Sequence, residues 1–267
     1  MTNLYIEPFL GEFGYELMGW QSVLRALSLD TPDKKLVVWC RPGHSYLYSD
    51  FAEVHLFDPG VIESNCDARI GGSEFVRPCD GEWLTVKDIY VNGWKSAFDG
   101  SLSHEFIQFG FGRPGDPSAT LVHARNTNKY NTGYRNWPLE HWIELVGGLS
   151  GQVASIGTED AAHHVPGTVD LRGRTLVELC DIMAASPLVI GPTSGPIHLA
   201  ALCKTPHVVW TGHRRTLQRC NNEWNPLKTE VIVYHNKFEW DAGEIWQPKP
   251  SEIIEEVRKL DASLVRS

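Results

Sequence analysis

The sequence predicts an α/β protein built from two domains. Short apolar runs alternate along the chain with segments of helical period, the pattern of a parallel sheet wrapped by helices. The alternation occurs in two series, and between them lies FGFGRPGDPSAT (Phe109–Thr120), which is rich in glycine and proline. We therefore expect one domain over residues 1–114 and a second over residues 115–267.

The first series is short. Strands are expected where apolar residues run together, and a helix is expected where they recur at helical spacing. The predicted strands are Leu4–Phe9, Lys34–Cys40 and Val54–Asp58, and the predicted helix is Leu17–Leu27. From about residue 58 to residue 104, glycine, tryptophan and acidic residues mix without a stable period, and no element is assigned there.

The second series is more regular. Its predicted strands are 119–124, 152–157, 187–191, 207–212 and 231–235. Its predicted helices are Pro138–Leu149, with proline in the first turn, Leu176–Ala185, Pro196–Leu202 and a last helix from Ser251, its N-cap, to about Leu260.

Composition narrows the class of protein. The chain has 267 residues, of which 42% are apolar and 21% charged, an ordinary globular balance. No apolar run reaches the roughly 18 residues that span a bilayer, and the N-terminus does not resemble a signal peptide. A net charge of −9 argues against a broadly basic nucleic-acid surface, and the six cysteines show no zinc-ligand spacing. We expect a cytoplasmic protein.

The stretch VIGPTSGPIHLAAL (Val189–Leu202) has the features of an anion site. A buried strand ends at Gly191, and Ser194 is a natural N-cap for the helix that follows. Gly195 lets the backbone approach a ligand, and Pro196 suits the first helical position. The helix N-terminus favours a pyrophosphate, to which His198 is also able to donate. The alternative is a capped helix with a packed histidine. The stretch is neither a dinucleotide-binding nor a P-loop fingerprint.

Charged residues follow two other predicted strands of the same domain. Arg125, Lys129 and Arg135 lie in the loop after residues 119–124 and are suited to clamp a phosphate. SIGTEDAAH (Ser155–His163) supplies Gly157, Thr158 and Glu159, whose carboxylate is a candidate partner for ribose hydroxyls. The alternative for each charge is a solvated loop.

The second half of the chain resembles the lipopolysaccharide heptosyltransferases, GT-B glycosyltransferases similar to family 9. The resemblance lies in RNWPLEHWIELVGGL (Arg135–Leu149) and in LRGRTLVELCDIMAASPLVIGPTSGPIHLAALCKTPHVVWTG (Leu171–Gly212), and it extends over roughly residues 120 to 212. It implies two Rossmann-like α/β/α domains that face each other across a cleft. It also implies a nucleotide-diphosphate sugar as co-substrate, with Arg135, Ser194, Gly195 and His198 at the donor. Family members often have an acid where this chain has Thr193, which leaves the sugar open.

The resemblance also implies a catalytic acid near the start of the first helix. In GEFGYELMGWQSVLRAL (Gly11–Leu27), Glu16 takes that position and Glu12 is the second choice. Such a carboxylate would deprotonate the acceptor hydroxyl in an inverting transfer. Cations and helix N–H groups would stabilise the leaving diphosphate, so no metal and no further cofactor is expected. The alternative for Glu16 is an acid that only stabilises the helix dipole.

The acceptor is expected to contact the N-terminal domain and the loop after residue 212. The candidates there are Trp20, Arg41, His44, Tyr46, Arg214 and Arg215. A saccharide or lipid-linked glycan ranks first as acceptor. A hydroxymethylated base in DNA ranks second, because the basic loop is small on an acidic chain. A nucleotide-sugar epimerase and a non-catalytic nucleotide-sugar or glycan-binding module are the remaining alternatives.

Overall fold

The architecture is taken from a computed structural model, which describes residues 1–60, 75–89, 100–111, 118–128, 135–211, 217–235 and 246–266. The chain divides into two units, Met1–Phe106 and Ile107–Ser267. The boundary expected at residues 114 and 115 lies outside the described residues. In the described part of the chain, no helix is long and apolar enough to cross a membrane.

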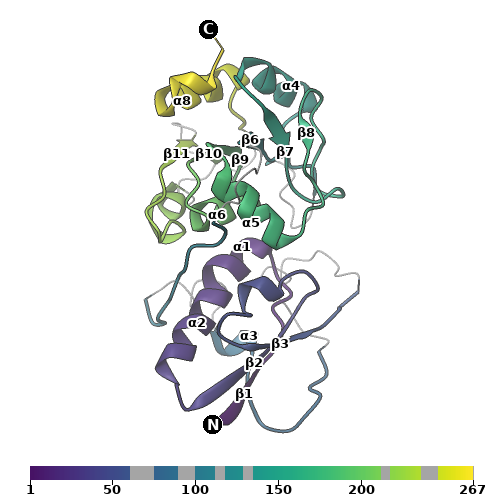
Figure 1. Cartoon of the computed structure of the whole chain (residues 1–267), viewed down its shortest axis with the longest axis vertical. Helices are drawn as coiled ribbons and strands as arrows, with labels where there is room; N and C mark the ends of the chain where they lie inside the picture. Colours follow the sequence, from purple (N-terminus) through teal and green to yellow (C-terminus); the bar gives the residue numbers. More distant parts are fainter. Residues whose placement is uncertain are drawn as a thin grey trace. The chain divides into compact units, whose positions relative to one another are not determined.

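The N-terminal unit contains a four-stranded sheet in the order β3-β2-β1-β4. The four strands pair in parallel (Figure 1). In the register of β1 and β2, Leu4 lies opposite Leu36. Their bounds are β1 Thr2–Ile6, β2 Lys34–Cys40, β3 Glu53–Leu56 and β4 Glu82–Leu84. Two short helical segments accompany them, η2 Ser45–Leu47 and α3 Val86–Ile89.

One helical segment joins β1 to β2, longer than the predicted helix 17–27. It consists of α1 (Phe13–Tyr15), a π-helical turn η1 (Glu16–Trp20) and α2 (Gln21–Asp30). Its apolar side chains Leu17 and Leu24 are fully buried. A π-helical turn inside a helix is uncommon and is frequently found at functional sites.

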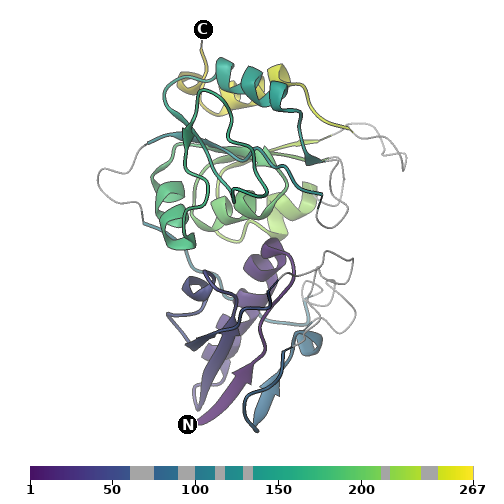
Figure 2. The ribbon, with the colours of Figure 1, turned by 90° about the vertical axis from the view of Figure 1, so that its right-hand side faces the viewer.

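The C-terminal unit contains a six-stranded parallel sheet in the order β11-β10-β9-β6-β7-β8. Helices α4 and α8 lie on one side of this sheet and α5 and α6 on the other, which makes an α/β/α sandwich (Figure 2). The strands are β6 Thr120–Val122, β7 Val153–Ser155, β8 Val169–Asp170, β9 Val189–Pro192, β10 His207–Thr211 and β11 Val231–His235. The helices are α4 Leu139–Gly148, α5 Leu176–Ala185, α6 Gly195–Leu202 and α8 Pro250–Leu260, with the shorter turns η7 Arg219–Glu223 and η8 Ala262–Leu264.

Tryptophans form the centre of the core between this sheet and helices α4 and α8. Trp142 is fully buried, and Trp137 and Trp210 are nearly so. The ring centroids of Trp137 and Trp210 lie 4.6 Å apart, and those of Trp142 and Trp210 lie 5.5 Å apart. Three of the ten tryptophans thus serve the core of one unit.

The last helix begins earlier than predicted. Lys249, and not Ser251, is the N-cap of α8, and Pro250 is its first residue. Proline suits this position because its missing N–H would have no partner in the helix. The backbone N–H of Lys249 donates to the carboxylate of Glu252 at 2.7 Å, so the reciprocal acid of the first turn fixes the start.

Candidate functional site

A buried carboxylate lies beyond the carboxyl ends of β1 and β2 in the N-terminal unit. Glu16 begins the turn η1, and the turn after β2 brings Arg41 and His44 to it. Gly43 in that turn has a φ of +82°, which glycine adopts without strain. In open parallel sheets, this end of the strands is where ligands bind.

Three side chains hold the Glu16 carboxylate, and the Glu16 side chain is 1% exposed. The Tyr48 hydroxyl donates to Oε1 at 2.8 Å. His44 Nδ1 lies 2.8 Å from Oε2, and the Arg41 guanidinium donates to the same oxygen. Both carboxylate oxygens are therefore engaged.

These contacts fix the charges of the cluster. Burial raises the pKa of Glu16, but the charges of His44 and Arg41, together with the hydrogen bonds, lower it to about 2. Burial, reinforced by the Glu16 charge, raises the pKa of Cys40 to about 12 and that of Tyr48 well above its ordinary value. Near neutral pH, Glu16 is an ion and the Tyr48 and Cys40 side chains are neutral.

This geometry is unfavourable for Glu16 as the base that takes the acceptor proton. A general base needs to reach the hydroxyl and works best with a pKa near the operating pH, and Glu16 is buried with a low pKa. Glu12 is half-buried at the N-cap of α1, where its carbonyl accepts from the N–H groups of Tyr15 and Glu16. The role of Glu12 stays a prediction.

The other residues expected on the acceptor side differ in their positions. Trp20 is fully buried and packs on Phe9 with 5.9 Å between ring centroids, which corrects the expectation that its ring contacts an acceptor. Tyr46 is half-buried in η2. Arg214 and Arg215 lie outside the described residues.

In the C-terminal unit, β9 leads into α6 through Thr193 and Ser194, which are both 7% exposed. Ser194 is the N-cap in an extended conformation, and Gly195 is the first helical residue, so Pro196 comes second. The Ser194 side chain does not cap the helix, contrary to expectation. Its Oγ instead lies 2.9 Å from Nδ1 of His123, just after β6.

Two of the three predicted phosphate-binding cations lie near this loop. Arg135 donates to the carbonyl oxygen of Thr193 at 2.5 Å, which places a guanidinium beside the start of α6. Arg125 is 4% exposed and donates to the side chain of Asn136. It thereby fastens the end of β6 to the segment before α4. Lys129 lies outside the described residues.

Two buried histidines lie close to the arginines at the start of α6. Burial, followed by the charges of Arg125 and Arg135, lowers the pKa of His123 to about 3. Burial, followed by the charges of Arg219 and Arg135, lowers the pKa of His198 well below its ordinary value. Both rings are neutral at physiological pH, and the arginines supply the charge. This charge, with the helix dipole, favours a bound anion.

His198 is packed more tightly than its predicted role requires. Its ring is 6% exposed and meets Trp224 edge-on, with 4.4 Å between centroids. The Arg219 guanidinium lies 4.4 Å from the centroid of the same tryptophan. A contact from His198 to an anion stays a prediction, and the neutral ring would donate a hydrogen bond without charge.

Gly157, after β7, is required by the packing of the site. Its φ is +121°, and a Cβ there would lie 2.8 Å from Ala162 and 3.0 Å from the ring of His123. A glycine therefore lets His123 take the place from which it contacts the N-cap of α6. Thr158 and Glu159 follow and are exposed, and their contact with a ribose stays a prediction.

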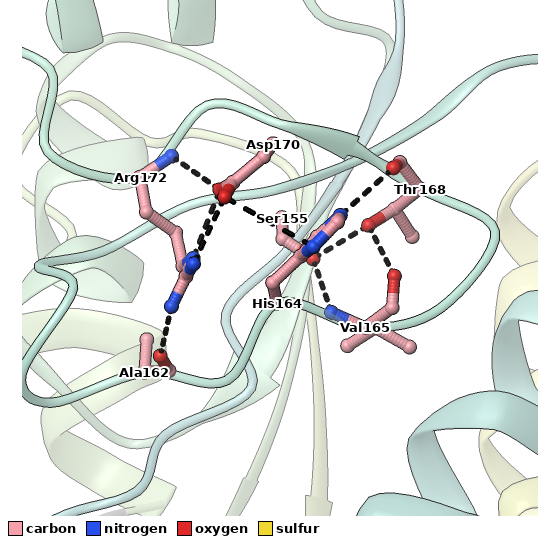
Figure 3. A network of polar contacts seen from close by, with 7 residues as sticks. All are labelled: Ser155, Ala162, His164, Val165, Thr168, Asp170 and Arg172. Carbon is pink, nitrogen blue, oxygen red and sulfur yellow. Dashed lines mark hydrogen bonds and ion pairs between the residues drawn. The ribbon is translucent and has the colours of Figure 1, made fainter.

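A polar network fastens the loop that follows β7 (Figure 3). Arg172 donates to both carboxylate oxygens of Asp170 at 2.9 Å and to the carbonyl of Ala162 at 2.9 Å. Ser155 Oγ accepts from the backbone N–H of Val165 at 3.0 Å. The loop is thereby held at its middle and at both ends, which keeps its glycine turn in place.

His123, Asn136 and Trp224 contribute to the site but are absent from the sequence prediction. His123 stands in LVHAR, directly after a predicted strand, and that position was the available signal. Asn136 and Trp224 contact the site only through tertiary packing, which no local pattern reports. Among the described residues, no group of three or more histidine, cysteine, aspartate or glutamate side chains is arranged to hold a metal ion.

Comparisons with known proteins give the architecture. No family model matches the sequence, and no curated protein matches it either. Solved structures do match over almost the whole chain. The fold is that of GT-B glycosyltransferases.

Three of the similar structures show the extent of the likeness. The ADP-heptose lipopolysaccharide heptosyltransferase II of E. coli is 16% identical, over 97% of this chain and 98% of its own, with a TM-score of 0.59. A family 9 glycosyltransferase from Veillonella parvula is 13% identical over 96% of each chain, with a TM-score of 0.60. The E. coli heptosyltransferase WaaC, solved with ADP-2-deoxy-2-fluoro heptose, is 12% identical over 96% of this chain and 99% of its own, with a TM-score of 0.55. These likenesses confirm the predicted fold class.

Proposed function

We propose that the chain is a glycosyltransferase that moves a sugar from a nucleotide-diphosphate sugar to an acceptor hydroxyl. The observation that carries the proposal is the start of α6, where the Arg135 guanidinium donates to the carbonyl oxygen of Thr193. Burial, and after it the arginine charges, lower the pKa of the two histidines beside it. A helix N-terminus in a positive field suits a diphosphate. The GT-B fold supports the proposal.

We propose an ADP-linked sugar as the first donor to test. WaaC has been solved with an ADP-sugar analogue, and a further similar structure, the heptosyltransferase TibC, in complex with ADP-D-β-D-heptose. Thr193 stands where related enzymes often have an acid, so the sugar itself is left to experiment. For the acceptor we propose a saccharide or lipid-linked glycan, and for the location the cytoplasm.

The proposed reaction is a single displacement that inverts the anomeric carbon. Arg135 and the N–H groups at the start of α6 would stabilise the charge that develops on the leaving diphosphate. These groups make a divalent ion dispensable in the proposed mechanism.

A thermal-shift screen tests the donor site. The protein is heated with ADP, UDP, GDP, CMP or dTDP, with Mg²⁺ or with EDTA. A nucleotide at about 100 times its Kd stabilises the folded state by about 2.7 kcal/mol. We expect a shift with one nucleoside diphosphate that survives EDTA and is lost in Arg135→Ala. The matched control is Arg258→Ala, an exposed arginine on α8. The absence of a shift with every nucleotide would contradict the proposal.

A further inference from the structure

His44 is the accessible member of the buried cluster in the N-terminal unit. Its side chain is 22% exposed, against 1% for Glu16. The ring meets Phe13 edge-on, with 5.3 Å between centroids. Its Nδ1 is engaged with Glu16, and within the part of the chain that the structure describes its Nε2 atom makes no hydrogen bond. Nδ1 is thus held by Glu16, and Nε2 is the ring nitrogen left for a ligand.

The contact with Glu16 sets which nitrogen carries the hydrogen. An ionised carboxylate only accepts hydrogen bonds, so the hydrogen of a neutral His44 ring lies on Nδ1 and the lone pair on Nε2. A buried carboxylate that orients an imidazole in this way also stabilises the imidazolium that forms when Nε2 takes a proton. Arg41 donates to the same carboxylate oxygen and holds it in place behind the ring.

We propose that His44 is the general base of the glycosyl transfer and that Glu16 is the positioning residue behind it. This inference rests on the proposed function. The proton of the acceptor hydroxyl moves to His44 Nε2, and the oxygen electron pair forms the new bond to the anomeric carbon. The bond from that carbon to the diphosphate oxygen breaks, and its electron pair leaves with the nucleoside diphosphate. The imidazolium then returns its proton to water.

The neighbouring groups do not compete for this role. Among the described residues, the charged and titratable side chains of this cluster besides His44 are Glu16 itself, Arg41 and Tyr48, which bond to Glu16, and Cys40, which interacts with its charge. The pKa of Glu16 is about 2, that of Cys40 is about 12, and that of Tyr48 lies well above its ordinary value. Since Arg41 also keeps its charge, none of the four changes charge between pH 5 and pH 9. The imidazole is therefore the group of this cluster that is left to take the acceptor proton.

The test combines a spectroscopic and a kinetic measurement on the full chain. Nitrogen-15 NMR of labelled histidines reports the tautomer of His44, assigned with His44→Ala. Turnover is followed as ADP released from an ADP-sugar, with water as acceptor. The matched control is His55→Ala, because His55 is also bonded to a glutamate in this unit but is 46% exposed. Nucleotide binding to each variant shows that the donor site is intact.

We expect the neutral form of the His44 ring to carry its hydrogen on Nδ1, and we expect Glu16→Gln to lose that preference. We expect His44→Ala to lower turnover by about 10²- to 10⁴-fold, with nucleotide binding unchanged. A hydrogen on Nε2, or turnover in His44→Ala within twofold of the wild type, would overturn the inference and leave the proposed function standing. If the wild type neither binds a nucleotide nor releases ADP, the proposed function fails and the catalytic role fails with it.

Discussion

In the Glu16→Gln variant, the free energy of unfolding is expected to lose the part of its pH dependence that comes from the buried carboxylate of the N-terminal unit. In the folded protein the pKa of Glu16 is about 2, against an ordinary 4.5. Each pKa unit corresponds to about 1.4 kcal/mol, so ionised Glu16 contributes about 3 kcal/mol to the free energy of unfolding at neutral pH. Because the folded pKa is the lower one, this stability is present above pH 4.5 and is lost as the pH falls towards 2.

The assay is urea denaturation of the wild type and of Glu16→Gln at steps from pH 2.5 to pH 7. Glutamine leaves Arg41 and His44 without a charged partner, so the variant is less stable than the wild type at pH 7. The difference in the free energy of unfolding between the two proteins is expected to narrow by about 3 kcal/mol as the pH is lowered, because the wild type loses the contribution of ionised Glu16, which the variant lacks at every pH.

A matched control separates this effect from general acid denaturation. Glu53 also bonds a lysine and a histidine, but it is exposed on β3, where water screens the charges. Glu53→Gln is expected to follow the wild-type curve closely. If the gap between the wild type and Glu16→Gln stays constant from pH 6 to pH 2.5, the buried ion cluster does not have the charges assigned to it.

Three further predictions concern the C-terminal unit. Gly157→Ala is expected to lower the free energy of unfolding by about 1–3 kcal/mol, because its φ is positive and the new methyl group would clash with Ala162 and His123. Gly147→Ala is expected to raise it by about 0.5–1 kcal/mol, because Gly147 is a residue of α4 with no atom near its new methyl group, and thermal melts compare the two variants. Ser194→Ala is expected to cost about 1 kcal/mol through the lost contact with His123 and to weaken nucleotide binding in calorimetry, and an unchanged Kd would remove Ser194 from the donor site. Trp142→Ala is expected to cost about 3–5 kcal/mol in denaturant unfolding, and a loss below 1 kcal/mol would contradict its place at the centre of the core.

The regular elements follow from local pattern, and so the sequence predicts them well. Three predicted segments, Lys34–Cys40, Leu176–Ala185 and Val231–His235, coincide with β2, α5 and β11 at both ends. Each is marked by apolar residues at a clear spacing and bounded by polar or turn residues. The helical segment after β1 runs from Phe13 to Asp30 and is longer than predicted at both ends.

The site is less predictable, because its chemistry depends on contacts between distant segments. The loop Thr193–Ser194 was expected from its glycines, prolines and strand-to-helix position. That Ser194 contacts His123 instead of capping α6 depends on the packing of β6 beside β9. Likewise, the sequence predicts Glu16 as the catalytic base, with a first-turn acid as the alternative, and only the fold shows that Arg41, His44 and Tyr48 enclose it.

Titration of ¹⁵N-labelled protein with a nucleoside diphosphate, in EDTA, tests the central claim most directly. The nucleotide is the one that gives the largest thermal shift. If the diphosphate binds at the start of α6, the backbone signals of Gly195 and Ile197 and the ring signals of His198 move in a saturable way, and Arg135→Ala weakens the effect. Saturable binding that leaves these signals unmoved would place the ligand elsewhere and contradict the account.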